Sequence, residues 1–206
     1  MNNIYSSNNL KTPKNNNNQS IEIIDVFIAV DVELIIQDIQ TSELSFSQDY
    51  KKPTVRDGRY FYYMTSQQKT YNNIGNLKVT GNISDIVRWR ASSLSAQSEY
   101  QVLLYDMKKI TGENNISFPV NLIKEIADIP IPQKNSVTPS ITYQKEHISY
   151  QESTLLSTGF SYYALYLAIY NRSKLIGYCS HGLSNKESLQ GLNGLPLTVT
   201  ISSSTD

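Results

Sequence analysis

The chain has 206 residues, which suits one large β domain and allows about 70% of the unfolded surface to be buried without disulfides or structural metals. It is 39% hydrophobic and 17% charged, with a formal net charge of zero. This neutrality argues against a nucleic-acid partner and favours self-association, because copies repel each other weakly. No apolar run is long enough to span a membrane, and the start lacks a signal peptide's apolar core. With a single cysteine, Cys179, no intrachain disulfide can form, so we expect a cytoplasmic protein.

The chain begins with an asparagine-rich stretch and continues into a strongly apolar one. Residues 1–20 show no periodicity, which predicts a disordered arm before a single domain over residues 21–206. The nearly continuous apolar run Ile23–Val30 predicts a central strand. Asp31 could then cap a short helix over Val32–Ile39, and a strand that continues past Asp31 is the alternative.

A loop and two strands are expected next. Thr41–Gly58 holds a proline and scattered charges and predicts a long loop. The aromatic segment Arg59–Ser66 predicts a strand, Gln67–Asn73 a turn, and Asn76–Thr80 a short strand.

The segment Asn82–Met107 carries the clearest strand pattern. Asp85–Arg90 alternates, so that Trp89 faces the core together with Val87 while the arginines face away. The polar segment Ala91–Ser98 suits a connection, and Glu99–Met107 is the expected return strand. A strand with one buried face requires a second layer, so this unit predicts a sheet packed on another sheet.

The C-terminal half predicts further strands. The pattern weakens over Thr111–Pro139, where Leu122–Ile126 is either one helical turn or a strand and the prolines mark loops or edges. One or two strands are expected over Ser140–Gln151, and a strong one over Phe160–Tyr170. Two more follow, at Leu175–Cys179 and Leu195–Ser202. The predicted fold class is therefore all-β, a β-sandwich of two antiparallel sheets with one short helix.

Catalytic and metal-binding patterns are weak. A structural zinc site needs four Cys or His ligands, and the chain holds only Cys179, His147 and His181. Cys179 and His181 would share one side of a strand, but no hydrolase signature surrounds them, so a Cys-His hydrolase ranks last. No nucleotide-binding loop is present, and the scattered aspartates do not form an EF-hand. We predict no enzyme activity, no metal and no cofactor.

Two features could serve ligand binding. The candidate sugar-contacting residues are an aromatic ring with charged neighbours for the hydroxyl groups: Asp49, Trp89, Arg90 and Asp106. A core position is the favoured interpretation of Trp89, because it alternates with Val87. The row Tyr162, Tyr166 and Tyr170 forms a ridged aromatic face, which is covered by another segment, paired with a second copy, or open to a ligand.

Three stretches resemble the PixA/AidA family of bacterial inclusion body proteins. They are Ile23–Ile35 (IIDVFIAVDVELI), Gly75–Met107 with its aromatic-Arg pattern, and Phe160–Ser180. The chain departs from the family at Cys179–Pro196, where CSHGLSNKESLQGLNGLP replaces an aromatic run before the last strand. The resemblance implies a protein that accumulates as cytoplasmic inclusions in bacteria.

Two functions follow as expectations. The first is a non-enzymatic protein that self-associates, as a homodimer or larger assembly, into intracellular and even crystalline inclusions. The alternative is a lectin that acts on host glycans after release, since some relatives look like sugar-binding proteins and β-sandwich loops carry such sites.

Arg90 carries a specific structural expectation. Arg88 and Arg90 share one sheet face and would repel each other unless acids lie opposite. We therefore expect Arg90 to be paired with a carboxylate and partly buried, with a solvated surface arginine as the alternative.

Overall fold

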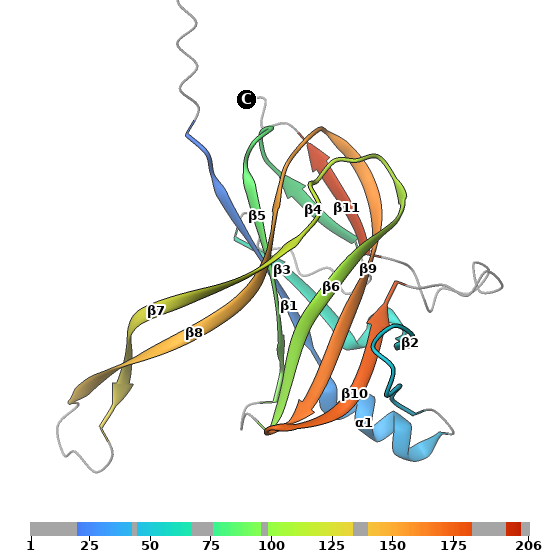
Figure 1. Cartoon of the computed structure of the whole chain (residues 1–206), viewed down its shortest axis with the longest axis vertical. Coiled ribbons are helices and arrows are strands. Elements are labelled where there is room, and N and C mark those ends of the chain that lie inside the picture. Colours follow the sequence, from blue (N-terminus) through green and yellow to red (C-terminus); the bar gives the residue numbers. More distant parts are fainter. Residues whose placement is uncertain are drawn as a thin grey trace, which may run out of the picture.

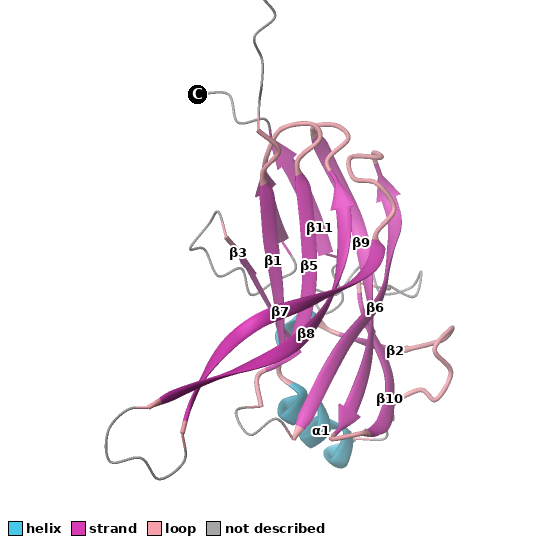
Figure 2. Cartoon of the chain, turned by 60° about the vertical axis from the view of Figure 1, so that its left-hand side comes forward, coloured by secondary structure: helices cyan, strands magenta, loops and turns pink. Residues whose placement is uncertain are grey.

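The computed structural model describes residues 20–42, 45–66, 76–95, 99–133, 140–182 and 197–202, and these fold as a two-layer β-sandwich (Figures 1 and 2). The first sheet has the order β3-β1-β5-β8-β7. Its strands are β1 (Ile23–Val30), β3 (Phe61–Thr65), β5 (Ile86–Ser93), β7 (Val120–Pro132) and β8 (Ile141–Thr154).

The second sheet is centred on β9 (Gly159–Asn171). One edge of β9 pairs with β6 (Tyr100–Gly112), and the other pairs first with β11 (Leu197–Ser202) and then with β10 (Lys174–His181). The outer strands are β4 (Asn76–Thr80), beside β11, and β2 (Thr54–Arg56), beside β10. The all-β sandwich is thus confirmed, but the antiparallel expectation is wrong in detail. Three strand pairs, β1/β5, β2/β10 and β4/β11, run parallel, so both sheets are mixed.

The core lies between the sheets and follows the alternation of the strands. On β1, Ile24, Val26 and Ile28 are buried on the inner face, as the period of two predicts. From the second sheet, Leu165 and Leu167 of β9 meet them in the same apolar cluster. Burial of such side chains contributes about 1.5–3 kcal/mol each, which makes this cluster the main source of stability.

The helix after β1 is confirmed and is slightly longer than expected. The helix α1 spans Val32–Thr41, and the Asp31 carboxylate accepts a hydrogen bond from the Leu34 N–H at 2.9 Å. This cap satisfies a backbone donor that the helix leaves unpaired, which ends the strand at Val30. Val32 and Ile35 bury the inner side of the helix.

Several expectations between the strong strands need correction. The return strand after β5 does not pair with β5, because β6 belongs to the second sheet and the connection crosses between layers. The expected loop Thr41–Gly58 contains β2, and Leu122–Ile126 lies inside a strand, β7. Ser140–Gln151 forms one long strand, β8. The disordered N-terminal segment predicted for residues 1–20 lies outside the described residues, except Ser20. The predicted turn Gln67–Asn73 lies outside them as well.

Strands β7 and β8 extend well beyond the sandwich as a twisted two-stranded ribbon, here called the arm (Figures 1 and 2). Only Gln151–Thr154 of β8 pair with β5, whereas the rest of β8 pairs with β7 alone. The described chain contains no helix long and apolar enough to cross a membrane.

Candidate functional site: a basic cleft on the first sheet

A cleft of about 350 Å³ lies on the outer face of the first sheet, where the arm leaves the sandwich. Its lining comes from four strands: Asp25, Val26 and Phe27 of β1, Arg88 and Arg90 of β5, Lys124 of β7, and Ile148 and Tyr150 of β8. The parallel register sets Asp25 beside Arg88 and Phe27 beside Arg90. Because Val87 and Trp89 point into the core, alternation turns both arginines outward into the cleft.

Arg88 is held in place by two contacts. Its Nε donates to a carboxylate oxygen of Glu152 at 3.1 Å, and its guanidinium group lies 5.1 Å from the centre of the Tyr150 ring. The two charged side chains are 24% and 26% exposed, so the pair is partly shielded from water. A charge-assisted hydrogen bond and a cation–π contact together fix one wall of the cleft.

The other charged groups of the cleft remain open. The side chains of Asp25, Arg90 and Lys124 make no hydrogen bond or ion pair with any described residue. Arg90 and Lys124 are exposed, and neither is neutralised within the described chain. The expectation that Arg90 is paired and partly buried is therefore wrong. Glu152, on β8, pairs with Arg88 instead.

Trp89 is fully buried, and its Nε1–H donates to the Ser153 hydroxyl at 3.2 Å. The core interpretation of Trp89 is thus confirmed, and the prediction that Trp89 contacts a ligand is wrong, because its buried ring offers no surface to a ligand.

Asp106 lies on the second sheet and Asp49 in the loop before β2, whereas Arg90 lies on the first sheet. The Asp49 carboxylate accepts a hydrogen bond from the Lys51 N–H at 2.9 Å, in the loop that bridges to β10 through Ser47 and Tyr178. Asp106, on β6, forms an ion pair with Lys108 at 3.4 Å. The structure therefore does not bring the four predicted residues together, and of these four only Arg90 lines the cleft.

The tyrosine face is covered by neighbouring segments. Tyr166 is only 7% exposed, because Tyr105 packs edge-on against it at 6.0 Å and the Lys108 ammonium lies 4.5 Å from the ring centre. Tyr105 also contacts Tyr178 at 5.6 Å and donates its hydroxyl hydrogen to the Tyr50 carbonyl at 2.7 Å. Tyr166, the central residue of the tyrosine row, is therefore covered by another segment of the same chain, which was one of the three alternatives.

Cys179 and His181 lie on the inner face of β10 and are closed to solvent. Burial raises the pKa of the Cys179 thiol to about 12 and lowers the pKa of the His181 imidazole to about 4. The thiol therefore stays protonated at neutral pH, and the imidazole stays neutral and stacks on Phe61 with ring centres 4.6 Å apart. This arrangement gives no support to a Cys-His hydrolase. Within the described residues, no group of three or more His, Cys, Asp or Glu is placed to hold a metal ion.

Several residues of the cleft were absent from the predicted site. The sequence carried a signal for three of them. Arg88 alternates with the buried Val87, and Asp25 and Phe27 alternate with buried residues of β1, so the pattern placed all three on the outer face. No comparable signal exists for Lys124 and Tyr150, because their position depends on the pairing of β7 and β8 with distant strands.

The fold and the cleft define a two-layer β-sandwich protein with its charged surface site on a sheet face. The family model of the PixA inclusion body proteins matches residues 22–184, and the chain belongs to this family. A crystal structure of an inclusion body protein of the PixA family from Burkholderia cenocepacia J2315 is similar, with a TM-score of 0.67 and 19% identity. The match covers 91% of this chain and 99% of that one, which shows a shared fold. No curated protein matches the chain.

Proposed function

We propose that this protein is a non-enzymatic component of cytoplasmic inclusions whose copies associate through the arm. The observation that carries the proposal is an unpaired strand edge. From Ile141 to Tyr150, no described strand pairs with β8 on the side opposite β7. A free edge presents N–H and C=O groups that a strand of another chain can pair with.

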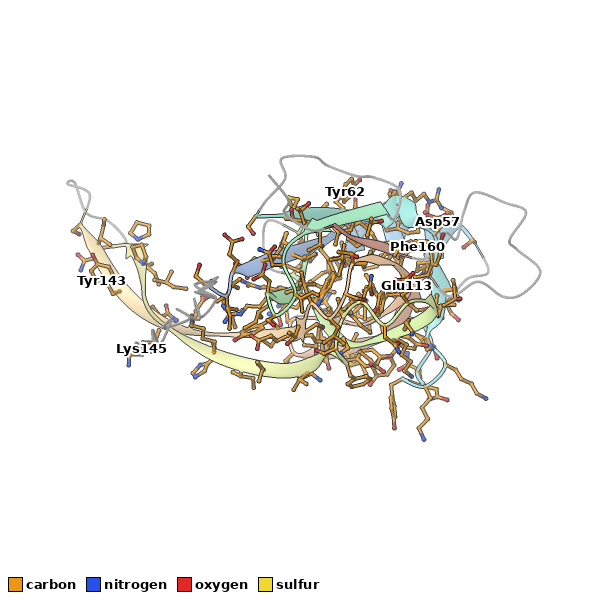
Figure 3. All side chains as sticks on the ribbon, turned by 90° about the horizontal axis from the view of Figure 1, so that it is seen from above. Asp57, Tyr62, Glu113, Tyr143, Lys145 and Phe160 are labelled. Carbon is orange, nitrogen blue, oxygen red and sulfur yellow. The ribbon has the colours of Figure 1, made fainter. Side chains whose placement is uncertain are left out.

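The arm also exposes apolar side chains that a monomer leaves in water. Ile123 is 75% exposed, Ile141 57% and Tyr143 67%. Figure 3 places Tyr143 and Lys145 on the arm, far from the body of the sandwich. A two-stranded ribbon is only marginally stable by itself, and additional strands with a covered apolar face stabilise it. Association with another copy would therefore add strands to the ribbon and cover its exposed apolar side chains.

A second copy is the partner that fits this edge. Two copies of β8 can pair antiparallel about a two-fold axis, which gives a closed and self-complementary interface. The free edge of β7 is less suited, because Pro130 and Pro132 lack the backbone N–H that strand pairing needs. The net charge of zero leaves little long-range repulsion between copies.

The test measures mass in solution. Light scattering coupled to size-exclusion chromatography should give a dimer or larger species for the wild type over a wide concentration range. The double variant Ile141→Lys/Tyr143→Lys should run as a monomer, because two exposed lysines block edge pairing and cost little in the folded monomer. The matched control is Ile83→Lys/Leu94→Lys, which adds the same charges at exposed sites outside the arm, and it should associate as the wild type does.

Electron microscopy of expressing bacteria extends the same comparison to the cell. Inclusions are expected with the wild type and the control, and reduced inclusions with the arm variant. A wild-type protein that stays monomeric at every concentration would refute self-association. An arm variant that assembles like the wild type would refute the role of the arm.

A further inference from the structure

We propose that the basic cleft binds a small hydroxylated organic anion, a molecule with one carboxylate or phosphate group, several hydroxyl groups and one apolar face. The proposal does not depend on self-association, although Ile148 and Tyr150 of the cleft lie at the end of the free β8 edge that is nearest to the sandwich. Its volume of about 350 Å³ lies at the lower end of the usual range for ligand sites, about 300–1,000 Å³, which suits a ligand the size of one sugar unit.

The charges of the cleft favour an anion. Arg88 is already neutralised by Glu152, whereas Arg90 and Lys124 line the same hollow without an ionic partner among the described residues. Two cations in one cleft repel each other, and an anion bound between them is attracted to both. Arginine presents paired N–H donors to a carboxylate or phosphate, and lysine adds a point charge.

The remaining lining residues define the rest of the ligand. Phe27, Ile148 and Tyr150 provide apolar surface for a ring or a chain. Tyr150 is fixed by the guanidinium group of Arg88, so this surface is formed before the ligand arrives. The free carboxylate of Asp25 accepts hydrogen bonds and repels a second negative charge, so it selects a molecule with hydroxyl groups near a single anionic group.

Titration calorimetry with defined probes tests the proposal. D-glucuronate and D-glucose 6-phosphate should bind at least tenfold more tightly than neutral D-glucose, and added salt should weaken them. Arg90→Ala and Lys124→Ala should each weaken glucuronate binding about tenfold or more. Arg172→Ala removes an exposed arginine in the turn between β9 and β10, whose ion pair with Glu99 is 3.8 Å long, and it should leave binding unchanged. Thermal melting of each variant checks that the fold is intact.

A second criterion is that one substitution should change the affinities for two probes in opposite directions. Asp25→Ala should weaken the binding of glucuronate, because the sugar hydroxyl groups lose their acceptor, and should tighten the binding of the doubly charged inorganic phosphate, because a repulsive negative charge is removed. An oligosaccharide ending in glucuronate distinguishes a glycan from a free metabolite: it binds like the free acid if the ligand is a glycan end and fails to bind if the cleft admits only the free molecule. The proposal is overturned if both anionic probes bind no better than glucose, or if Arg172→Ala weakens binding as much as Arg90→Ala. Because these measurements can be made on the arm variant, failure of self-association would not affect them.

Discussion

Replacement of Asp85 should cause a large loss of stability, because its carboxylate joins two segments of the first sheet. Asp85 is 3% exposed and lies between β4 and β5. One carboxylate oxygen accepts the Glu22 N–H at 3.0 Å, just before β1, and the other accepts the Asn82 N–H at 2.7 Å. Asp85→Ala leaves both donors without an acceptor. Each such group costs about 1–3 kcal/mol, and water reaches these part-buried donors, so we expect a loss of about 3 kcal/mol.

Urea unfolding, followed by the fluorescence of Trp89, measures this loss. Asp85→Asn keeps one acceptor oxygen and should lose about half as much. Asp106→Ala is the matched control, because its partly exposed ion pair with Lys108 contributes under about 1 kcal/mol. If Asp85→Ala unfolded within about 1 kcal/mol of the wild type, the carboxylate would not be the link between these segments.

Three further outcomes are expected. Cys179 should react with a thiol reagent far more slowly in the native protein than in urea, because burial keeps the thiol protonated; equal rates would contradict this. Arg90→Ala should change the unfolding free energy by less than about 1 kcal/mol, since its side chain is exposed and has no described partner; a loss near 3 kcal/mol would indicate a buried pair. His181 has a folded pKa of about 4, below its ordinary value, so as pH falls the unfolded state takes up the proton first. Its contribution is full above about pH 6.5 and is lost towards pH 4, by about 3 kcal/mol in all, and His181→Leu should flatten that part of the stability profile.

The sequence predicts elements well wherever one face of a segment is buried. β1 begins and ends at Ile23 and Val30 as expected, and the Asp31 cap marks the start of α1. In β9 the inward set Tyr163, Leu165, Leu167 and Ile169 is buried as predicted, and Ala164, Tyr166 and Ala168 on the opposite face are covered as well. In each case the burial of a side chain is decided by its own strand and leaves a local pattern.

The pairing of strands leaves no such local pattern. β5 and β6 are adjacent in the chain and both alternate, but they lie in different sheets, and β5 pairs parallel with β1. Alternation records which face is buried, not which strand lies alongside.

The same limit explains the error at Arg90. Arg88 and Arg90 were correctly placed on one face, but Glu152 lies opposite Arg88 in the register of β5 and β8. That register joins residues 64 positions apart in the chain, and a shift of two residues would have given the carboxylate to Arg90.

The sequence pattern was weakest over Thr111–Pro139, which contains β7 of the arm, and the structure gives the physical reason. Along β7 and β8, apolar side chains such as Ile123, Ile141 and Tyr143 are exposed and have no core to face. Without a buried face inside the monomer, selection for folding imposes no alternation on these strands. If copies associate through the arm, the residue pattern of β7 and β8 is determined by contacts with another copy and not by the core of the same chain. The exposed apolar residues of the arm are then retained for assembly, and their replacement by lysine should affect association far more than folding.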